Sequence, residues 1–343
     1  MRKSLLCKIF ISIWVLVSFS ASECYSQTRI FFNLNEIMTL KTGNLDSYSA
    51  LDCNGFDFIG LCDARYYPEN EILLRTNMGV FLYDCSSNKL VTSFSRKGKA
   101  SYEYTYVSDF GMVDNLVYIY DINTKKILWF DKTGKYLKTD FMSDRAGDKP
   151  FSSFARCGNG YIGKRIYSMT DAPQLAFYDN EFRFLKDIEG VSPLTSGIDL
   201  YKQFSRGSEG EILYTYYFDR KIMAVSPQGA KDKYIVDFGK YNVPDIDRFK
   251  DEYDIIDYVN SAEKKMATYV SRINENECFL SFFFILHKGK SCLGVYDFNT
   301  GKTASYIFHK DESETVTIVP GNNCAYVFYE NEDGNVNVGQ FLY

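Results

Sequence analysis

A strand-turn-strand pattern recurs along this chain and limits what it can fold into more than any other feature of the sequence. The clearest copy covers residues 115–141, NLVYIYDINTKKILWFDKTGKYLKTDF. Two apolar runs, LVYIYD and KILWF, flank the polar pair NT, and the turn TGK leads into a third run. Short runs rich in aromatic and β-branched residues, bounded by turn residues, predict β-strands joined by tight hairpins.

Fainter copies of the pattern occur along most of the chain, at residues 71–94, 160–188, 210–238, 277–308 and 323–343. They begin roughly every 45 to 50 residues, apart from one longer interval before residue 277, and such a fixed period is typical of a β-propeller blade. The six copies therefore predict an all-β fold, in which residues 27–343 form a single six-bladed β-propeller domain.

The apolar runs support this architecture. YIYD, ILWF, FLSFFFIL and AYVFY are apolar at consecutive positions, which indicates that both faces of each strand are buried. A propeller blade buries both faces because it packs between two neighbours. Aromatic residues, 17% of the chain, are large enough to fill the wedge that widens outward between blades. A β-sandwich or two stacked all-β domains is the alternative, and the even spacing of the copies argues against it.

The last copy is short, with the two strands AYVFYE and NVGQFLY on either side of one turn. A closing strand from the N-terminus would complete that blade and protect its open edge. Residues 29–35, RIFFNLN, are the candidate for this strand.

Residues 1–26 have the pattern of a cleavable secretory signal peptide. Arg2, Lys3 and Lys8 are followed by the apolar run IFISIWVLVSF and then by small and polar residues. We expect cleavage after Ser26 and a periplasmic or secreted protein without a transmembrane segment in the mature chain. The rival interpretation is an outer-membrane lipoprotein with a lipid anchor at Cys24, which the unfavourable Glu23 before it argues against.

The remaining cysteines and the charge exclude some classes of partner and site. Seven cysteines follow residue 26, an odd number with scattered spacing that predicts neither a disulfide framework nor a CxxC metal site. In an oxidising compartment a disulfide could form between Cys53 and Cys62, or between Cys278 and Cys292. The net charge of −5, with acids and bases interspersed, argues against nucleic acid as a partner.

Residues 238–272 interrupt the repeat. Ile246, Phe249, Tyr253 and Ile256 recur at helical spacing after Pro244, which predicts a short amphipathic helix within a helical insertion at about residues 244–266. Insertions in propellers lie on a rim and often cover the central channel. We expect a lid packed on the ring, with direct contact to a ligand as the alternative.

Residues 93–140 carry a more specific pattern. An acidic and aromatic loop, an aspartate-aromatic pair, a strand ending in Asp and a strand ending in F-D-x-x-G-K follow one another. The matching positions are Gly98, Glu103, Tyr104, Asp109, Phe110, Asp121, Phe130, Asp131, Gly134 and Lys135. The pattern resembles a family of six-bladed β-propellers abundant among secreted proteins of Gram-negative gut bacteria, similar to TolB-like and NHL-like propellers. Ala100, Ser101 and Tyr102 replace the family's Gly-Pro-Gly. The resemblance implies the fold and no particular reaction, because propellers host binding, lyase and hydrolase activities alike.

The chemistry-bearing residues do not form a recognisable catalytic pattern. The two histidines, His287 and His309, each stand beside a strand without a neighbouring acid or cysteine, so we expect no metal site and no cofactor. Asp121, Asp131, Asp179 and Asp297 follow aromatic strand ends, where aspartate usually forms turns.

The channel mouth is the expected binding site, because the innermost strands and the loops before them meet there. The residues predicted to lie at this mouth are Arg65, Tyr66, Glu103, Tyr104, Asp109, Arg156 and Arg206. A ring of arginines, acids and tyrosines suits a polar or sugar-like ligand.

These features favour a non-catalytic ligand-binding or protein-interaction module, with a glycan, a peptide or an envelope protein as partner. The alternative is a polysaccharide hydrolase or lyase whose site lies in the central channel, with Asp63, Glu103 and Asp109 as candidate carboxylates. A structural subunit of an envelope assembly is a third hypothesis.

Overall fold

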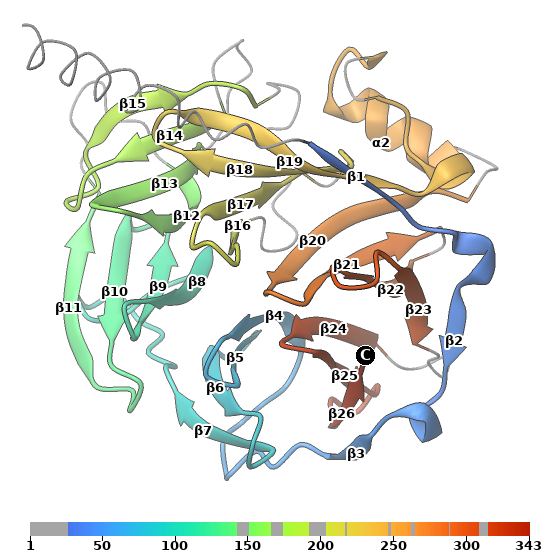
Figure 1. Cartoon of the computed structure of the whole chain (residues 1–343). Coiled ribbons are helices and arrows are strands. Elements are labelled where there is room, and N and C mark those ends of the chain that lie inside the picture. The colour runs from blue at the N-terminus through green and yellow to red at the C-terminus, as the bar shows by residue number, and fades with distance from the viewer. Residues whose placement is uncertain are drawn as a thin grey trace, which may run out of the picture.

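Six β-sheets stand around a central axis in the computed structural model of the chain (Figure 1). The structure describes residues 27–142, 151–165, 174–191, 204–216, 218–245, 248–261, 265–287, 289–308 and 315–343. The expected signal peptide, the Cys24 anchor site and His309 lie outside these residues. The six-bladed β-propeller predicted from the repeat is confirmed.

Blades are numbered here in chain order. Blade 1 consists of β4 (Leu61–Tyr67), β5 (Glu71–Thr76), β6 (Val80–Asp84) and β7 (Lys89–Ser93). Blade 2 consists of β8 (Asp109–Val113), β9 (Leu116–Asp121), β10 (Lys126–Phe130) and β11 (Tyr136–Phe141). Blade 3 consists of β12 (Phe151–Cys157), β13 (Gly160–Arg165), β14 (Leu175–Tyr178) and β15 (Phe184–Ile188).

The other three blades each include a strand from the N-terminal segment. Blade 4 consists of β16 (Phe204–Arg206), β17 (Ile212–Thr215), β18 (Lys221–Ser226), β19 (Gly229–Asp237) and β1 (Thr28–Phe31). Blade 5 consists of β20 (Ala267–Glu275), β21 (Phe279–Leu286), β22 (Lys290–Asp297), β23 (Thr303–Phe308) and β2 (Met38–Leu40). Blade 6 consists of β24 (Thr315–Gly321), β25 (Cys324–Glu330), β26 (Val336–Leu342) and β3 (Ser47–Ala50). Short 3₁₀ helices, η1 (Leu34–Glu36), η2 (Thr42–Asn44) and η4 (Gly239–Tyr241), lie in the connections.

The N-terminal segment closes the ring, but with a different strand from the predicted one. Residues 29–35 were expected to join the last blade, and β1 instead pairs in parallel with β19 of blade 4. The chain then runs along the outside of the ring, pairs in parallel with β23 through β2, and reaches blade 6 as β3, antiparallel to β26 (Figure 1). An extended apolar segment satisfies any open outer edge, so its sequence predicts a strand without identifying the partner.

Apolar side chains fill all six seams between neighbouring blades, as the apolar runs predicted. One hydrophobic cluster joins each adjacent pair of blades. Between blades 6 and 1, for example, the rings of Tyr83 and Phe328 meet edge to face with centroids 5.7 Å apart. The widening wedge is therefore filled by aromatic side chains drawn from both sheets.

The turn role expected for the four strand-end aspartates is confirmed. In each case one carboxylate oxygen accepts hydrogen bonds from backbone N–H groups two to four residues further along the chain. Asp131, for instance, accepts from the N–H of Thr133 at 2.9 Å and of Lys135 at 3.0 Å, while Gly134 takes the positive φ of +83° that the turn requires.

The predicted insertion contains one helix, α2 (Glu252–Ser261), which is shorter than the expected range 244–266. Ile255 is its fully buried residue and packs with Tyr216, Phe218 and Met266. Tyr253, expected on the apolar face, is 72% exposed, and Ile246 lies outside the described residues. Phe249 and Ile256 of the predicted face do pack against this cluster, so the prediction is confirmed for these two residues and wrong for Tyr253. Ile255 is buried in its place, because the partners of the helix come from the β17–β18 connection and the residue before β20.

No helix among the described residues is long and apolar enough to cross a bilayer.

Candidate functional site

A cavity of about 460 Å³ lies at one mouth of the central channel. Its lining comes from the C-terminal ends of the innermost strands β4, β8, β12, β16 and β20, the turns that follow them, and Asn322 after β24. All six blades therefore contribute to one site, the usual place for a ligand in a propeller and within the usual size range of ligand pockets. The α2 cluster packs against the start of β20, so it lies at the other end of that strand from the cavity.

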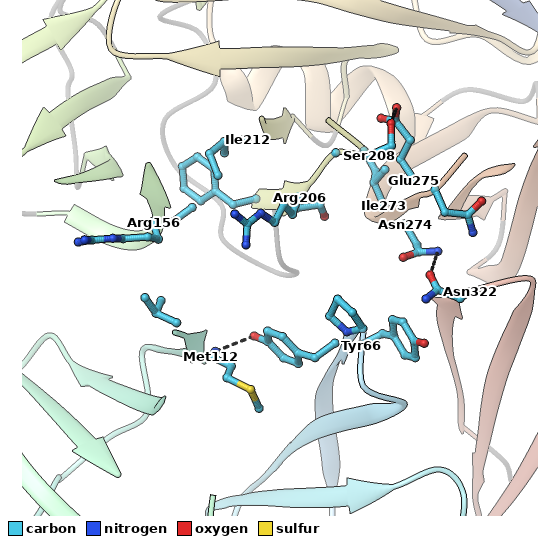
Figure 2. Close-up of a pocket in the computed structure, with 18 of the residues that line it drawn as sticks. Tyr66, Met112, Arg156, Arg206, Ser208, Ile212, Ile273, Asn274, Glu275 and Asn322 are labelled. Atoms are coloured by element: carbon cyan, nitrogen blue, oxygen red, sulfur yellow. Dashed lines mark hydrogen bonds between the residues drawn. The ribbon is translucent and has the colours of Figure 1, made fainter. Parts of the chain in front are cut away.

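The cavity has a polar side and an apolar side. Blades 5 and 6 supply the polar side, from Asn274, Glu275, Asn276, Glu277 and Asn322. Blades 2, 3 and 4 supply most of the apolar residues, which are Met112, Val113, Phe154, Ala155, Phe204 and Ile212. The same blades also supply Asp114, Arg156, Ser205, Arg206 and Ser208. Tyr66 of blade 1 lies between the two sides (Figure 2), and Tyr67 of the same blade also lines the cavity.

Arg206 is the last residue of β16, and its guanidinium extends toward the open middle of the cavity (Figure 2). The backbone around it is fixed, because Arg206 pairs with Ile212 and the following turn is closed by Gly207 N–H donating to the Glu211 carbonyl at 2.9 Å. The side chain itself is exposed, and it makes no hydrogen bond or ion pair with any described residue.

Arg156 of β12 also belongs to the lining but is already engaged. Its Nη1 donates to Asn180 Oδ1 at 2.7 Å, and its Nε lies 3.9 Å from Asp114 Oδ2. The guanidinium also lies 5.0 Å from the centroid of the Tyr161 ring. Figure 2 shows Arg156 directed away from the middle of the cavity, whereas Arg206 extends toward it.

The tyrosines of the lining are held in place as hydrogen-bonding groups. The Tyr67 hydroxyl accepts from Met112 N–H at 3.0 Å, and the Tyr66 hydroxyl donates to Asn70 Oδ1 at 2.9 Å. Burial raises the pKa of both hydroxyls to about 12. Both side chains are therefore neutral at physiological pH.

A buried charged cluster supports the polar side of the cavity at the seam between blades 4 and 5. Glu275 Oε1 accepts from Lys233 Nζ at 2.7 Å, Ser208 Oγ at 2.9 Å and Tyr234 OH at 3.1 Å. Lys233 also donates to Glu211. Burial of Lys233 disfavours its charge, but its hydrogen bonds to Glu211 and Glu275 outweigh burial and raise its pKa. The cluster holds Lys233 protonated and fixes the end of β20.

A second buried network lies in the channel, where β4, β8 and β20 come together. Arg65 Nη1 donates to Asp109 Oδ1 at 2.6 Å, and Arg65 Nε donates to Asp63 Oδ2 at 3.2 Å. Arg272 Nη2 reaches Asp63 Oδ1 at 3.1 Å, while its Nη1 donates to the Ile318 carbonyl at 3.0 Å. These contacts tie blades 1, 2, 5 and 6 together at the centre of the ring.

Both aspartates of this network have their oxygens occupied. Asp109 Oδ2 accepts from Tyr118 OH at 3.0 Å and Phe154 N–H at 3.3 Å, and Asp63 Oδ1 also accepts from Ala64 N–H at 2.9 Å. Each of the two aspartates is 2% exposed and surrounded by donors of the protein itself. Their negative charges therefore stabilise the fold by neutralising buried arginines.

The structure brings some of the predicted site residues together and separates others. Tyr66, Arg156 and Arg206 line the cavity, whereas Arg65 lines a small space of about 30 Å³ deeper in the channel and Asp109 is paired with it. All seven were expected in the loops that precede strands. Arg65, Tyr66, Arg156 and Arg206 lie inside the innermost strands instead, and the cavity is at the turns that follow.

Glu103 and Tyr104 lie in the loop between β7 and β8 and do not line the cavity. Glu103 Oε2 accepts from Ala100 N–H at 2.9 Å, and Tyr104 is fully buried between blades 1 and 2. This loop carries the motif of the family resemblance, and its contacts organise the connection between the two blades.

Sequence reasoning did not identify Asn274, Glu275, Asn322 or Lys233. The signal available was the polar run INENE at residues 273–277, which ends the innermost strand of blade 5. Among the described residues, no group of three or more His, Cys, Asp and Glu side chains is placed to hold a metal ion. All seven described cysteines are free thiols, including both pairs considered above.

Comparison with known proteins places the chain within one fold. A family model described as a 6-bladed beta-propeller, DUF5128, matches residues 62–321, more than half of the chain. Comparison with curated proteins finds no match.

Two solved structures from Bacteroides are similar in architecture. A Bacteroides fragilis protein assigned as exported is 13% identical with a TM-score of 0.71, over 93% of this chain and 100% of that one. A member of the DUF4221 family from Bacteroides vulgatus is 9% identical with a TM-score of 0.58, over 87% of this chain and 97% of that one. The predicted resemblance to exported propellers of this group is confirmed. At these identities the likeness concerns the fold alone.

Proposed function

This chain belongs to the 6-bladed beta-propeller family DUF5128, and on that fold we propose that it is an exported, non-catalytic module that binds a small polar ligand at the channel mouth. Export is supported by the signal pattern of residues 1–26 and by the exported Bacteroides fragilis neighbour. A glycan and a peptide are the ligand classes we expect.

The observation that carries the proposal is the contrast between the cavity and the network beneath it. In the channel, the charges are paired and buried, as Arg65 with Asp109 illustrates. At the mouth, Arg206 makes no hydrogen bond or ion pair with a described residue and is exposed to a cavity that all six blades line. A rigid concave site with a few unsatisfied polar groups is typical of a ligand pocket.

Binding without catalysis is favoured by the state of the candidate carboxylates. The carboxylate oxygens of Asp63 and Asp109 already accept hydrogen bonds from arginines, a tyrosine and backbone N–H groups. A general base or nucleophile must instead reach the substrate or an attacking water.

A thermal-shift screen of the purified protein tests the proposal, with oligosaccharides, short peptides and divalent cations as the panel. A ligand present at 100 times its Kd stabilises the folded state by about 2.7 kcal/mol, which at about 2 °C per kcal/mol or more raises the Tm by several degrees.

The variant Asn322→Trp places a large ring at the exposed rim of the cavity, and Asn299→Trp makes the same change in the β22–β23 turn away from it. We expect a hit that stabilises the wild type and Asn299→Trp but not Asn322→Trp. A hit that stabilises all three proteins equally would place the ligand elsewhere. If only a protein partner is captured in a pull-down, and Asn322→Trp still binds it, the cavity is not the site.

A further inference from the structure

We propose that the ligand of the cavity is a saccharide that carries a carboxylate, and that Arg206 is the residue that binds this carboxylate. The inference rests on the proposed binding function and makes it more specific. Nothing in the resemblance to other propellers assigns this role to Arg206.

The first argument is the charge that the cavity leaves unbalanced. Among the described residues, Arg156 and Arg206 are the cations of the lining, and Arg156 is held by Asn180 and Asp114. The nearby Lys233 is buried and paired with Glu211 and Glu275, so it is not available to the cavity. Arg206 therefore offers its full set of donors to the cavity. A guanidinium presents these donors in a planar fork that matches a carboxylate, which it binds through two parallel hydrogen bonds.

The second argument is the position of the acids. Glu275 belongs to the lining, but its Oε1 accepts from Lys233, Ser208 and Tyr234, and its Oε2 is buried. Glu277 is exposed in the turn that follows β20, on the polar side, whereas Arg206 extends from β16. Asp114, the third acid of the lining, lies beside Arg156 on blade 2. No described acid makes an ion pair with Arg206, which leaves this cation for a ligand.

The third argument is the two-sided lining, which favours a sugar. A pyranose ring has an apolar face of C–H groups and a rim of hydroxyls that both donate and accept. Met112, Val113 and Phe154 provide an apolar wall, and amide groups that both donate and accept face it. Asn274 and Asn322 are joined by an Nδ2 to Oδ1 contact of 3.4 Å and reach the cavity together (Figure 2).

The size of the cavity agrees with a short oligosaccharide. Its volume of about 460 Å³ is within the range of small-molecule sites and leaves room for a few sugar rings at most. The walls of the cavity come from six blades that the propeller holds in fixed positions. The ligand therefore enters a preformed site, and little binding energy is lost to ordering the protein around it.

Calorimetric titration with matched acidic and neutral sugars tests the inference. The probes are the trimers of galacturonate, mannuronate and guluronate, each paired with its fully methyl-esterified form, which keeps the sugar rings and linkages and replaces each charge by a methyl ester. We expect at least one acid trimer to bind, its ester to bind about tenfold or more weakly, and the acid's affinity to fall as salt rises.

Two arginine variants assign the effect. Arg206→Gln should remove the preference for the acid over its ester, whereas Arg156→Gln, the same loss of charge in the same lining, should retain it. Because Arg206 is exposed, its variant should keep the wild-type Tm, which separates a loss of recognition from a loss of fold.

The contrary results are distinct from a failure of the proposed function. If an ester binds as tightly as its acid, or Arg206→Gln keeps the preference, the carboxylate role of Arg206 is wrong while binding at the cavity stands. If triglutamate binds and no sugar does, the saccharide class is wrong. If the Asn322→Trp comparison shows no ligand in the cavity at all, the proposed function itself fails.

Discussion

The buried network of Asp63, Arg65, Asp109 and Arg272 makes the strongest energetic prediction, because its charges balance. Two carboxylates and two guanidinium groups meet in the channel, each residue less than a tenth exposed. The substitution Asp109→Asn keeps the shape of the side chain and removes one negative charge. Two buried arginines would then share the single carboxylate of Asp63.

The expected cost follows from this imbalance. Removing one partner of a buried ion pair typically costs about 3–5 kcal/mol, because the other charge stays buried without compensation. Burial of Arg65 already opposes its charge, and Asp109 and then Asp63 overcome that effect and raise its pKa. Against a total stability of about 5–15 kcal/mol for a typical protein, this loss is large. At about 2–4 °C per kcal/mol, the Tm should fall by about 6–20 °C.

Thermal and urea denaturation followed by circular dichroism measure the effect, with two comparisons. Asp114→Asn makes the same change in the exposed β8–β9 turn and should leave stability nearly unchanged. The pair Arg65→Met with Asp109→Leu removes both charges and leaves Asp63 with Arg272, so it should cost less than Asp109→Asn alone. An Asp109→Asn protein within about 1 kcal/mol of the wild type, the value of an exposed pair, would refute the reasoning.

Two further predictions concern pH and ring closure. Burial alone would raise the pKa of Asp63, but Arg65 and Arg272 outweigh it and lower the pKa, so its contribution to stability is present above about pH 4 and is lost as the pH falls below that. The Tm difference between the wild type and Asp63→Asn should therefore shrink between about pH 6 and about pH 3, and a constant difference would contradict the assignment. In blade 6, a Cβ on Gly339 would lie 2.3 Å from Leu45 Cδ1 and 3.3 Å from the Ser47 carbonyl. Gly339→Val should lower the free energy of unfolding by about 1–3 kcal/mol and speed proteolysis of residues 34–50. A Cβ on Gly43 meets nothing within 4 Å, so Gly43→Val should change neither quantity. Equal cleavage of the two variants would count against closure of the ring by β3.

The repeat predicted the outer strands of the blades well and the innermost strands poorly. The copy at residues 115–141 corresponds to β9, β10 and β11, and the side chains of β9 and β10 pack against neighbouring sheets. The innermost strand of the same blade, β8, begins with the buried Asp109, whose partner Arg65 belongs to blade 1. Innermost strands carry charges whose partners come from other blades, so the periodic apolar signal is weak there.

The path of the N-terminal segment shows the limit of local pattern. RIFF reads as a strand and forms one, but its partner β19 is about 200 residues away in sequence. The open outer edges of blades 4, 5 and 6 are alike in offering unpaired backbone groups. The connections through η1 and η2 decide which edge each short strand reaches, and no propensity of the strand residues contains that information.

The sequence predicted the location of the candidate site better than it predicted the residues that line it. Propeller architecture points to the channel mouth, and three of the seven predicted residues line the cavity there. The sequence does not distinguish Arg65, whose guanidinium is paired with Asp109 from another blade, from Arg206, which has no ion-pair partner in the part of the chain that the structure describes. Both are arginines of innermost strands. What distinguishes them is a distance between blades, which a single sequence does not carry.

The two fates of these arginines explain how one ring can be both stable and able to bind. Charges deep in the channel are desolvated, so each must be neutralised by a partner within the protein, and they hold the blades in fixed positions. Charges at the mouth are solvated by water, so they need no partner within the protein and can bind an opposite charge on a ligand. Because the same strands carry both, the paired layer beneath holds the backbone of the mouth in place. Substitutions in the lower layer should therefore lower stability and those at Arg206 should change recognition, and this separation is what the Asp109 and Arg206 variants compare.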